Sequence, residues 1–271
     1  MTIQEIKKSA KLNLKGTYIK CSSSCLLYFI IIMVLGYLSN IIELRLEDHI
    51  IPLTIIQAIF GVISIVLLYG LTYNILALSQ RKTKSITKFV DYSILNFGRF
   101  TKVLLQTLIR IIVPLFIFFL CLYYFLGTFF ASVNKTNFLC FYANLMPLAI
   151  TLLVVSLLVL IYFLLKYVLV AFICYTDKDL NSKEVVQKSA KLMKGQKWNY
   201  IGLILSFFGW ILLTSVILYG LSYFVDPAWL TPIVIVFYTL IRPYVVESES
   251  IFYESLGDQE ETPKKANKKT A

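Results

Sequence analysis

The chain has 271 residues, of which 58% are hydrophobic and only 15% are charged, and its mean hydropathy is +0.76. A soluble domain carries about a quarter charged residues, so this composition excludes an ordinary soluble fold and predicts an all-α polytopic membrane protein. The net charge of +11 calls for an anionic partner. Because the basic residues flank apolar runs, this partner is predicted to be the membrane surface and not nucleic acid.

Six apolar runs are long enough to cross a bilayer core of about 30 Å, which takes about 20 helical residues. In chain order they are Ser24–Ile42, Ile51–Leu78, Val103–Phe130, Leu145–Cys174, Tyr200–Phe224 and Leu230–Val246. The connections within the pairs one–two, three–four and five–six are short, so we expect six transmembrane helices arranged as three hairpins. No small-residue cleavage site follows the first run, which is therefore expected to remain as a span.

The loops differ in their content of basic residues. Lysines and arginines fill the segment before the first run, the loops after the second and fourth runs, and the C-terminal tail. The opposite loops contain only Arg45 and Lys135. Because loops rich in Lys and Arg remain in the cytoplasm, both termini are predicted to be cytoplasmic.

A short motif occurs twice, each time just before an apolar run. Lys8-Ser9-Ala10-Lys11-Leu12 recurs as Lys188-Ser189-Ala190-Lys191-Leu192, and a Lys-Gly pair follows each copy. The middle loop has a weaker version, an amphipathic stretch over 84–97 followed by Gly98. This pattern predicts a unit of cytoplasmic interfacial amphipathic helix, glycine stop and hairpin that is used three times.

The predicted domain organisation follows from these units. Residues 1–256 form a single membrane domain, with repeat units of about 1–80, 81–176 and 177–256. After Leu256 the composition becomes polar and charged. Residues 257–271 are therefore predicted to form a disordered cytoplasmic tail.

The interfacial helices carry lysines along their polar sides, and these lysines are predicted to contact anionic lipid headgroups. They are Lys8, Lys11, Lys15, Lys188, Lys191 and Lys194. Each such lysine contributes about 1 kcal/mol of attraction to an anionic membrane. The alternative is that these segments are solvated helical loops whose lysines serve only as topology signals.

Groups for catalysis are sparse in this sequence. The single histidine, His49, lies in a predicted outer loop beside Glu47 and Asp48, a pattern more typical of a solvated turn than of a metal site. The apolar runs contain no Asp or Glu, and no glycine-rich phosphate-binding motif occurs. The five cysteines are odd in number and form no CxxC motif. We expect no enzyme activity, no catalytic residue, no metal site and no cofactor.

Three basic residues interrupt the apolar runs: Arg110, Lys166 and Arg242. A charge in the bilayer core costs about 2.5–3.5 kcal/mol. All three lie in the predicted cytoplasmic half, where long side chains can extend to the headgroups. The alternative is that they converge on a cytoplasm-facing cavity for an anion or a lipid phosphate, with Glu247 or Glu249 as a partner.

Two further positions carry structural expectations. Pro243 removes a helix hydrogen-bond donor next to Arg242, which predicts a kink or a helix end there. Trp198 and Tyr200 are placed where amphipathic aromatic residues anchor a span, so they are predicted to lie at the inner membrane interface.

Several of these residues are similar to those of a known family. The matching stretches are Lys8–Lys11, Leu14–Gly16, Ser189–Trp198, Leu205–Trp210, Pro243-Tyr244 and Phe252–Leu256. On them the chain resembles a family of integral membrane proteins of mainly Gram-positive bacteria, catalogued as domain of unknown function 975. The resemblance implies a multi-pass protein of the bacterial plasma membrane, but no activity, catalytic residue or cofactor. The hairpin repeat is more loosely similar to the membrane domain of some glycerophosphodiester phosphodiesterases.

Three functional interpretations follow. The leading one is a non-enzymatic plasma-membrane protein that acts through lipid or protein partners, such as an envelope, immunity or assembly factor. The alternative is a transporter of small molecules or peptides, or the membrane subunit of one with an ABC-type ATPase as its partner; internal repeats and buried cations favour it. A membrane-bound enzyme of lipid headgroups is the least favoured.

Overall fold

The computed structural model describes residues 1–45, 50–134 and 146–267, and every regular element within these ranges is an α-helix. Glu47, Asp48, His49 and Lys135 lie outside the described residues. Five helical stretches are long and apolar enough to cross a membrane, as expected for a multi-pass membrane protein. They are Tyr18–Arg45, Ile51–Ser79, Phe97–Phe130, Met146–Thr176 and Lys197–Leu221. The sixth predicted span, 230–246, lies within the long helix α12 (Pro227–Asn267). That this stretch crosses the membrane stays a prediction.

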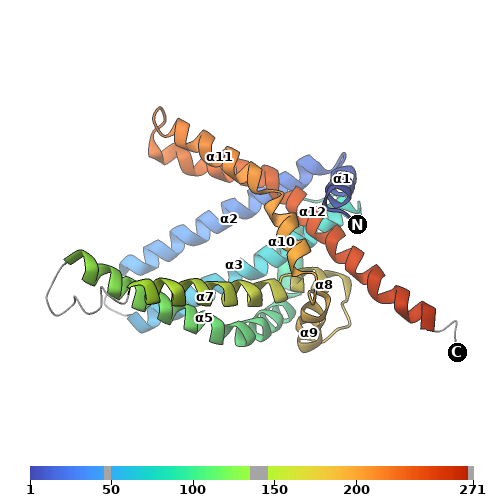
Figure 1. Cartoon of the computed structure of the whole chain (residues 1–271). Helices are drawn as coiled ribbons and strands as arrows, with labels where there is room; N and C mark the ends of the chain where they lie inside the picture. The colour runs from blue at the N-terminus through green and yellow to red at the C-terminus, as the bar shows by residue number, and fades with distance from the viewer. Residues whose placement is uncertain (46–49, 135–145, 268–271) are drawn as a thin grey trace. The chain divides into compact units, whose positions relative to one another are not determined.

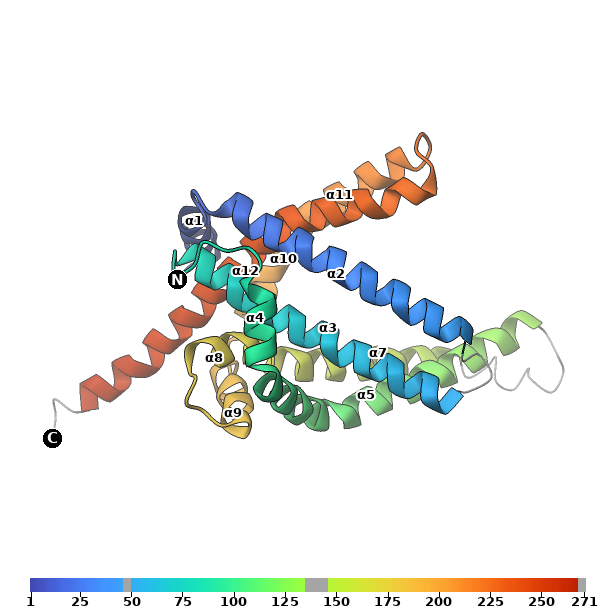
Figure 2. The same ribbon diagram turned by 180° about the vertical axis from the view of Figure 1, so that it is seen from behind.

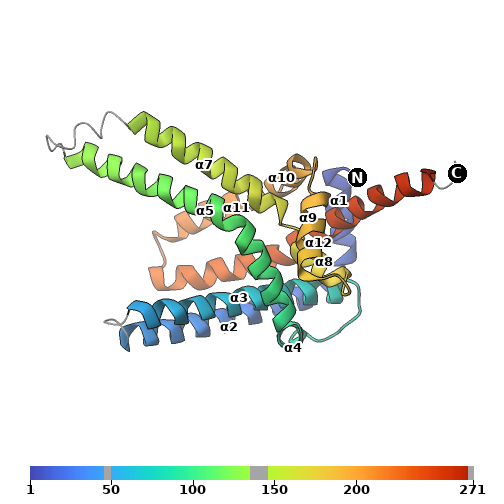
Figure 3. The same ribbon diagram turned by 90° about the horizontal axis from the view of Figure 1, so that it is seen from below.

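The chain folds into two compact units. The first comprises residues 1–101, residues 171–178 and the chain from Gly195 onward. Its helices are α1 (Ile3–Asn13), α2 (Tyr18–Arg45), α3 (Ile50–Ser79), α4 (Lys88–Leu95), α8 (Val170–Thr176), α10 (Lys197–Leu205), α11 (Phe208–Leu221) and α12. Within this unit α2 packs beside α3, and α11 packs against the first part of α12 (Figures 1 and 3).

The second unit comprises residues 102–170 and 179–194. It contains most of α5 (Phe97–Asn134), α7 (Met146–Lys166) and α9 (Ser182–Leu192). The helices α5 and α7 approach each other where the Thr128 hydroxyl donates to the Met146 sulfur at 3.6 Å. The long helices of both units expose large apolar side chains, among them Ile112 (59% exposed) and Val216 (68% exposed). Such surfaces are stable in lipid but not in water.

The N-terminal helix α1 is held by protein contacts. It begins with a capping box, in which Glu5 N–H donates to Thr2 Oγ1 and Thr2 N–H donates to Glu5 Oε2. Its apolar face, formed by Ile6, Ala10 and Leu14, is buried, and α1 packs against α12 and α10. Protein therefore covers this face of α1, and the interfacial position of the helix stays a prediction.

Glycine ends two of the three predicted interfacial segments. Gly16 follows α1 with a φ of +86°, and Gly195 follows α9 with a φ of +81°. This left-handed region costs glycine little. The middle segment differs from the prediction: its helix α4 covers only Lys88–Leu95, and Gly98 lies inside α5. Here Asn96 makes the turn, with a φ of −106°.

Two predicted spans are interrupted. One is broken between α7 and α8, at residues 167–169, and the other between α10 and α11, at residues 206–207. At the first break the Ser189 hydroxyl of α9 donates to the Lys166 carbonyl at 3.1 Å. At the second, Lys7 Nζ of α1 donates to the Ser206 carbonyl at 3.1 Å and lies 4.6 Å from the Phe207 ring centroid. A polar backbone group without a partner is costly in a membrane, so these side chains stabilise the interrupted helices.

The short helix α4 lies against α3 at a glycine (Figure 2). The Ser93 hydroxyl of α4 donates to the Val66 carbonyl of α3 at 3.3 Å. A Cβ atom placed on Gly70 would lie 1.9 Å from Ser93 Oγ and 2.5 Å from the Phe89 carbonyl oxygen. Only glycine permits this approach of the two backbones, as at many helix contacts within membranes.

The last helix is longer than the sequence predicts. It continues through Pro243, where a kink or a helix end was expected, and reaches Asn267, so residues 257–267 are helical where a disordered tail was expected. Extending an existing helix costs far less than starting one. A stretch of polar residues that directly follows a packed helix can therefore continue that helix.

Candidate functional site

Four consecutive residues of α12, Glu247 to Ser250, are polar and buried, with exposed fractions between 0 and 9%. We call them the polar segment. Successive side chains of a helix point about 100° apart, so burial of four in a row means that protein surrounds α12 on all sides here. The helices α1, α2 and α3 pack against α12, and α10 contributes Tyr200.

Glu249 is one of the two buried carboxyls of the polar segment. The Tyr200 hydroxyl donates to its Oε1 atom at 2.6 Å. Burial raises the pKa of Glu249, while the positive charge of Arg242 and the Tyr200 hydrogen bond act in the opposite direction. Arg242 precedes Glu249 by seven residues, or two helical turns, so both lie on the same side of α12.

Glu247 is bound from the N-terminal part of the chain. Asn13, at the end of α1, donates its side-chain N–H to Glu247 Oε1 at 2.8 Å. Burial raises the pKa of Glu247, and the Asn13 hydrogen bond opposes this shift. Glu247 Oε2 and Arg242 Nε are buried polar atoms without a hydrogen-bond partner among the described residues. A buried carboxyl oxygen without a hydrogen-bond donor favours the protonated form of Glu247, because burial penalises the negative charge of the carboxylate.

The polar segment can therefore hold protons, but it does not resemble a hydrolytic centre. Its two carboxyls are approached by a tyrosine, an amide and a guanidinium. No nucleophile with an adjacent base is formed by these groups. Within the part of the chain that the structure describes, no three His, Cys, Asp or Glu side chains are grouped to hold a metal ion.

A second feature of the first unit is a groove along α1, with a volume of about 880 Å³. We call it the α1 groove. It is lined by Lys7, Lys8, Lys11, Leu12, Leu14, Lys15, Gly16, Tyr18, Trp210 and Tyr244. Three exposed lysines, Lys8, Lys11 and Lys15, occupy one face of α1 and its end, because they are three and four residues apart.

A smaller apolar cleft of about 230 Å³ adjoins the aromatic side of the α1 groove. Tyr18, Trp210 and Tyr244 line both. The remaining walls of the cleft are Leu213, Thr214, Phe237, Leu240 and Ile241, from α11 and α12. A row of cations thus adjoins an apolar cleft between helices, an arrangement that suits a molecule with an anionic head and a hydrocarbon chain.

Of the three basic residues singled out in the apolar runs, Arg242 belongs to the first unit, whereas Arg110 and Lys166 belong to the second. All three are half-buried. Arg242 lies within electrostatic range of Glu249, one of its two predicted partners. Lys166 Nζ lies 5.6 Å from the Tyr167 ring centroid. A common cavity for all three residues stays a prediction.

The lysines of the second motif copy lie on α9 and just after it. Lys188 is half-buried, while Lys191 and Lys194 are exposed. The face of α9 opposite them buries Val185, Val186 and Leu192. Lys191 and Lys194 thus lie on the outer side of their helix, as Lys8, Lys11 and Lys15 do on α1. Contact of these lysines with lipid stays a prediction.

Sequence reasoning missed three contributors to these sites. The sequence predicts Tyr200 to be an interfacial anchor, but this residue is only 4% exposed and its hydroxyl donates to Glu249. Trp198, at 81% exposed, remains compatible with an anchor. No site role was predicted for Asn13 or Lys7, because no local pattern shows that α1 contacts α10 and α12. The sequence feature that could have indicated a buried polar site is the run of four polar residues, Glu247 to Ser250, directly after an apolar stretch.

The comparisons with known proteins give one match. A family model described as "Protein of unknown function (DUF975)" matches residues 1–260, which confirms the resemblance found in the sequence. The match includes both α1 and the polar segment. No curated protein matches the chain, and no solved structure matches it.

Proposed function

We propose that this chain, which belongs to the DUF975 family of proteins of unknown function, is a non-enzymatic protein of the bacterial plasma membrane that acts by binding anionic lipids through the α1 groove. One observation carries the proposal: three exposed lysines border a groove that shares an aromatic wall with an apolar cleft between α11 and α12. The positive charges of the lysines suit a phosphate headgroup, and the apolar walls of the cleft suit an acyl chain.

The proposed location of the groove supports this function. With both termini in the cytoplasm, α1 precedes its span at the inner membrane surface, where anionic lipids are concentrated. Tyr18 and Trp210, which are 37% and 52% exposed, have the amphipathic rings that are common at headgroup level. Lys7 is already bound to the Ser206 carbonyl, so Lys8, Lys11 and Lys15 are the groups proposed to bind the lipid.

Replacing Lys8, Lys11 and Lys15 together with glutamine is expected to weaken binding of anionic lipid by about 3 kcal/mol at low salt, at about 1 kcal/mol for each charge. The measurement is native mass spectrometry of the full chain, titrated with phosphatidylglycerol and, separately, with phosphatidylcholine. The matched control replaces three exposed lysines outside the groove, Lys84, Lys88 and Lys102. Equal loss of phosphatidylglycerol binding in both triple variants would show that only net charge matters.

The proposed orientation has its own test. In a chain whose native cysteines are replaced by alanine, a single cysteine at Asp226, just beyond the fifth predicted span, is expected to react with an impermeant thiol reagent in intact cells. One at Lys194 is expected to react only after lysis. Both positions are exposed, so accessibility within the fold does not limit the reaction. Labelling of position 194 in intact cells would contradict cytoplasmic termini.

A further inference from the structure

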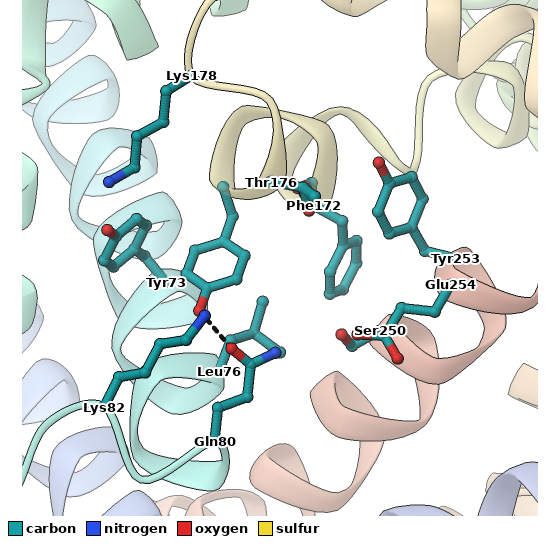
Figure 4. A pocket seen from close by; sticks show the side chains of 11 residues that line it. Tyr73, Leu76, Gln80, Lys82, Phe172, Thr176, Lys178, Ser250, Tyr253 and Glu254 are labelled. Carbon is teal, nitrogen blue, oxygen red and sulfur yellow. Dashed lines mark hydrogen bonds between the residues drawn. The ribbon is translucent and has the colours of Figure 1, made fainter. Parts of the chain in front are cut away.

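A pocket of about 300 Å³ lies in the first unit, separate from the α1 groove (Figure 4). Its walls come from the end of α3, from α8 and from α12. We call it the tyrosine pocket, after Tyr73, Tyr175 and Tyr253. This volume is at the lower end of the range for small-molecule sites, about 300–1,000 Å³.

The interior of the tyrosine pocket is aromatic and apolar. Phe172 and Tyr253 are buried and stack with an interplanar angle of 23°, and Leu76 is 1% exposed. The Tyr73 and Tyr175 rings meet edge to face, with centroids 4.6 Å apart. Rigid rings of this kind bind planar molecules by stacking at little entropic cost.

The mouth of the pocket is polar and carries more positive than negative charge. Lys82 and Lys178 are exposed and line it, opposed by the single carboxylate of Glu254. Lys82 Nζ lies 5.7 Å from the Tyr175 ring centroid, and Lys178 Nζ lies 5.9 Å from that of Tyr73. Because lysine ammonium groups already lie over these two rings, a cationic ligand would be repelled and an anionic one attracted.

One hydrogen bond orients a neutral donor at the same mouth. The Tyr175 hydroxyl donates to Gln80 Oε1 at 2.8 Å, drawn as the dashed line in Figure 4. With its oxygen accepting from Tyr175, Gln80 presents its amide N–H groups for other acceptors. In the same view Glu254 lies away from the two lysines, where its carboxylate can accept a hydrogen bond from a ligand hydroxyl.

We propose that the tyrosine pocket binds a small phosphate ester with a planar ring, of the size of a nucleoside monophosphate. The ring stacks on the aromatic interior, and the phosphate lies between Lys82, Lys178 and Gln80 at the mouth. In the proposed orientation both lysines face the cytoplasm, so the ligand is a soluble cytoplasmic molecule. The site shares no residue with the α1 groove, and lipid binding is not required for it.

The test uses the full chain in nanodiscs of neutral lipid, titrated by calorimetry with adenosine monophosphate, adenosine, inorganic phosphate or vesicles of phosphatidylglycerol. Adenosine monophosphate is expected to bind at least tenfold more tightly than either adenosine or inorganic phosphate. Equal binding of inorganic phosphate would overturn the role of the ring. Equal binding of adenosine would overturn the role of the lysines. Binding of the vesicles alone, or of none of the four, would overturn the site.

Variants then locate the binding. Replacing Lys82 with glutamine is expected to weaken binding of adenosine monophosphate about tenfold, or about 1.4 kcal/mol, because the variant lacks a charged donor to the phosphate. Lys178→Gln is expected to act similarly. The control is Lys84→Gln, in the same loop but outside the pocket. Tyr175→Phe keeps the aromatic ring and removes the hydroxyl that donates to Gln80. Unchanged affinity in both Lys82→Gln and Lys178→Gln, with thermal unfolding as in the wild type, would contradict the proposal.

Discussion

Replacing Gly70 with alanine is expected to destabilise the first unit by about 3 kcal/mol, the upper part of the usual range for overpacked sites. The added methyl group would meet Ser93 Oγ and the Phe89 carbonyl oxygen. A serine side chain can rotate away, but a backbone carbonyl in α4 cannot move without the helix. We expect α4 to shift away from α3 and the Ser93–Val66 hydrogen bond to be lost.

A second glycine of the same helix provides the control for this substitution. A Cβ atom on Gly61 would meet nothing within 4 Å, so Gly61→Ala is expected to be neutral or to stabilise α3 by up to about 1 kcal/mol. Both variants are compared by thermal unfolding of the purified protein in one detergent. If Gly70→Ala unfolds at the same temperature as Gly61→Ala, the close contact between α3 and α4 does not exist in solution.

The stability of the protein is expected to fall as the pH rises above about 4.5, owing to the two carboxyls of the polar segment. Burial raises the pKa of both Glu247 and Glu249 above their ordinary value of 4.5. The folded chain therefore holds protons that the unfolded chain releases. The stabilisation from the protonated forms is complete below the unfolded pKa and is lost as the pH rises through the folded pKa.

Replacing both carboxyls with glutamine is expected to remove most of this pH dependence, which is measured as the unfolding temperature between pH 5 and pH 8. The control is Glu5→Gln. The backbone N–H of Thr2 lowers the pKa of Glu5, so any contribution from this exposed group is lost as the pH falls, the opposite direction. A double variant that keeps the wild-type slope would show that other groups govern the pH dependence.

Replacing Tyr200 with phenylalanine leaves the buried Glu249 without its hydrogen-bond donor. This change is expected to lower the free energy of unfolding by about 1–3 kcal/mol.

Hydropathy and loop length were sufficient to predict where the long helices lie. The predicted runs fall within α2, α3 and α5 because a bilayer demands about twenty apolar helical residues whatever their neighbours are. The breaks at 167–169 and 206–207 could not be predicted. No proline occupies them, and the groups that satisfy the freed carbonyls, Ser189 and Lys7, lie far away in the sequence.

The candidate sites were predicted less well than the fold. Lys8, Lys11 and Lys15 were identified from their spacing, but the rings of Trp210 and Tyr244 that complete the groove depend on tertiary packing. Glu249 was named only as a possible partner of Arg242, since nothing local shows that Tyr200 of α10 binds it. The tyrosine pocket combines residues from three distant segments, and no motif in any one of them indicates it.

The packing of α1 on α12 has a consequence for the order of assembly. Asn13 and Glu247 are bonded across 234 positions of the chain, so α12 is synthesised long after α1, the helix that it covers. The second unit is built from residues 102–170 and 179–194, and its helices are available to one another earlier. Domains usually fold from the N-terminus during synthesis. In this chain α1 is synthesised before the other described helices but is among the last to reach its final place. A nascent chain that stops before residue 227 leaves the apolar face of α1 without α12 to cover it.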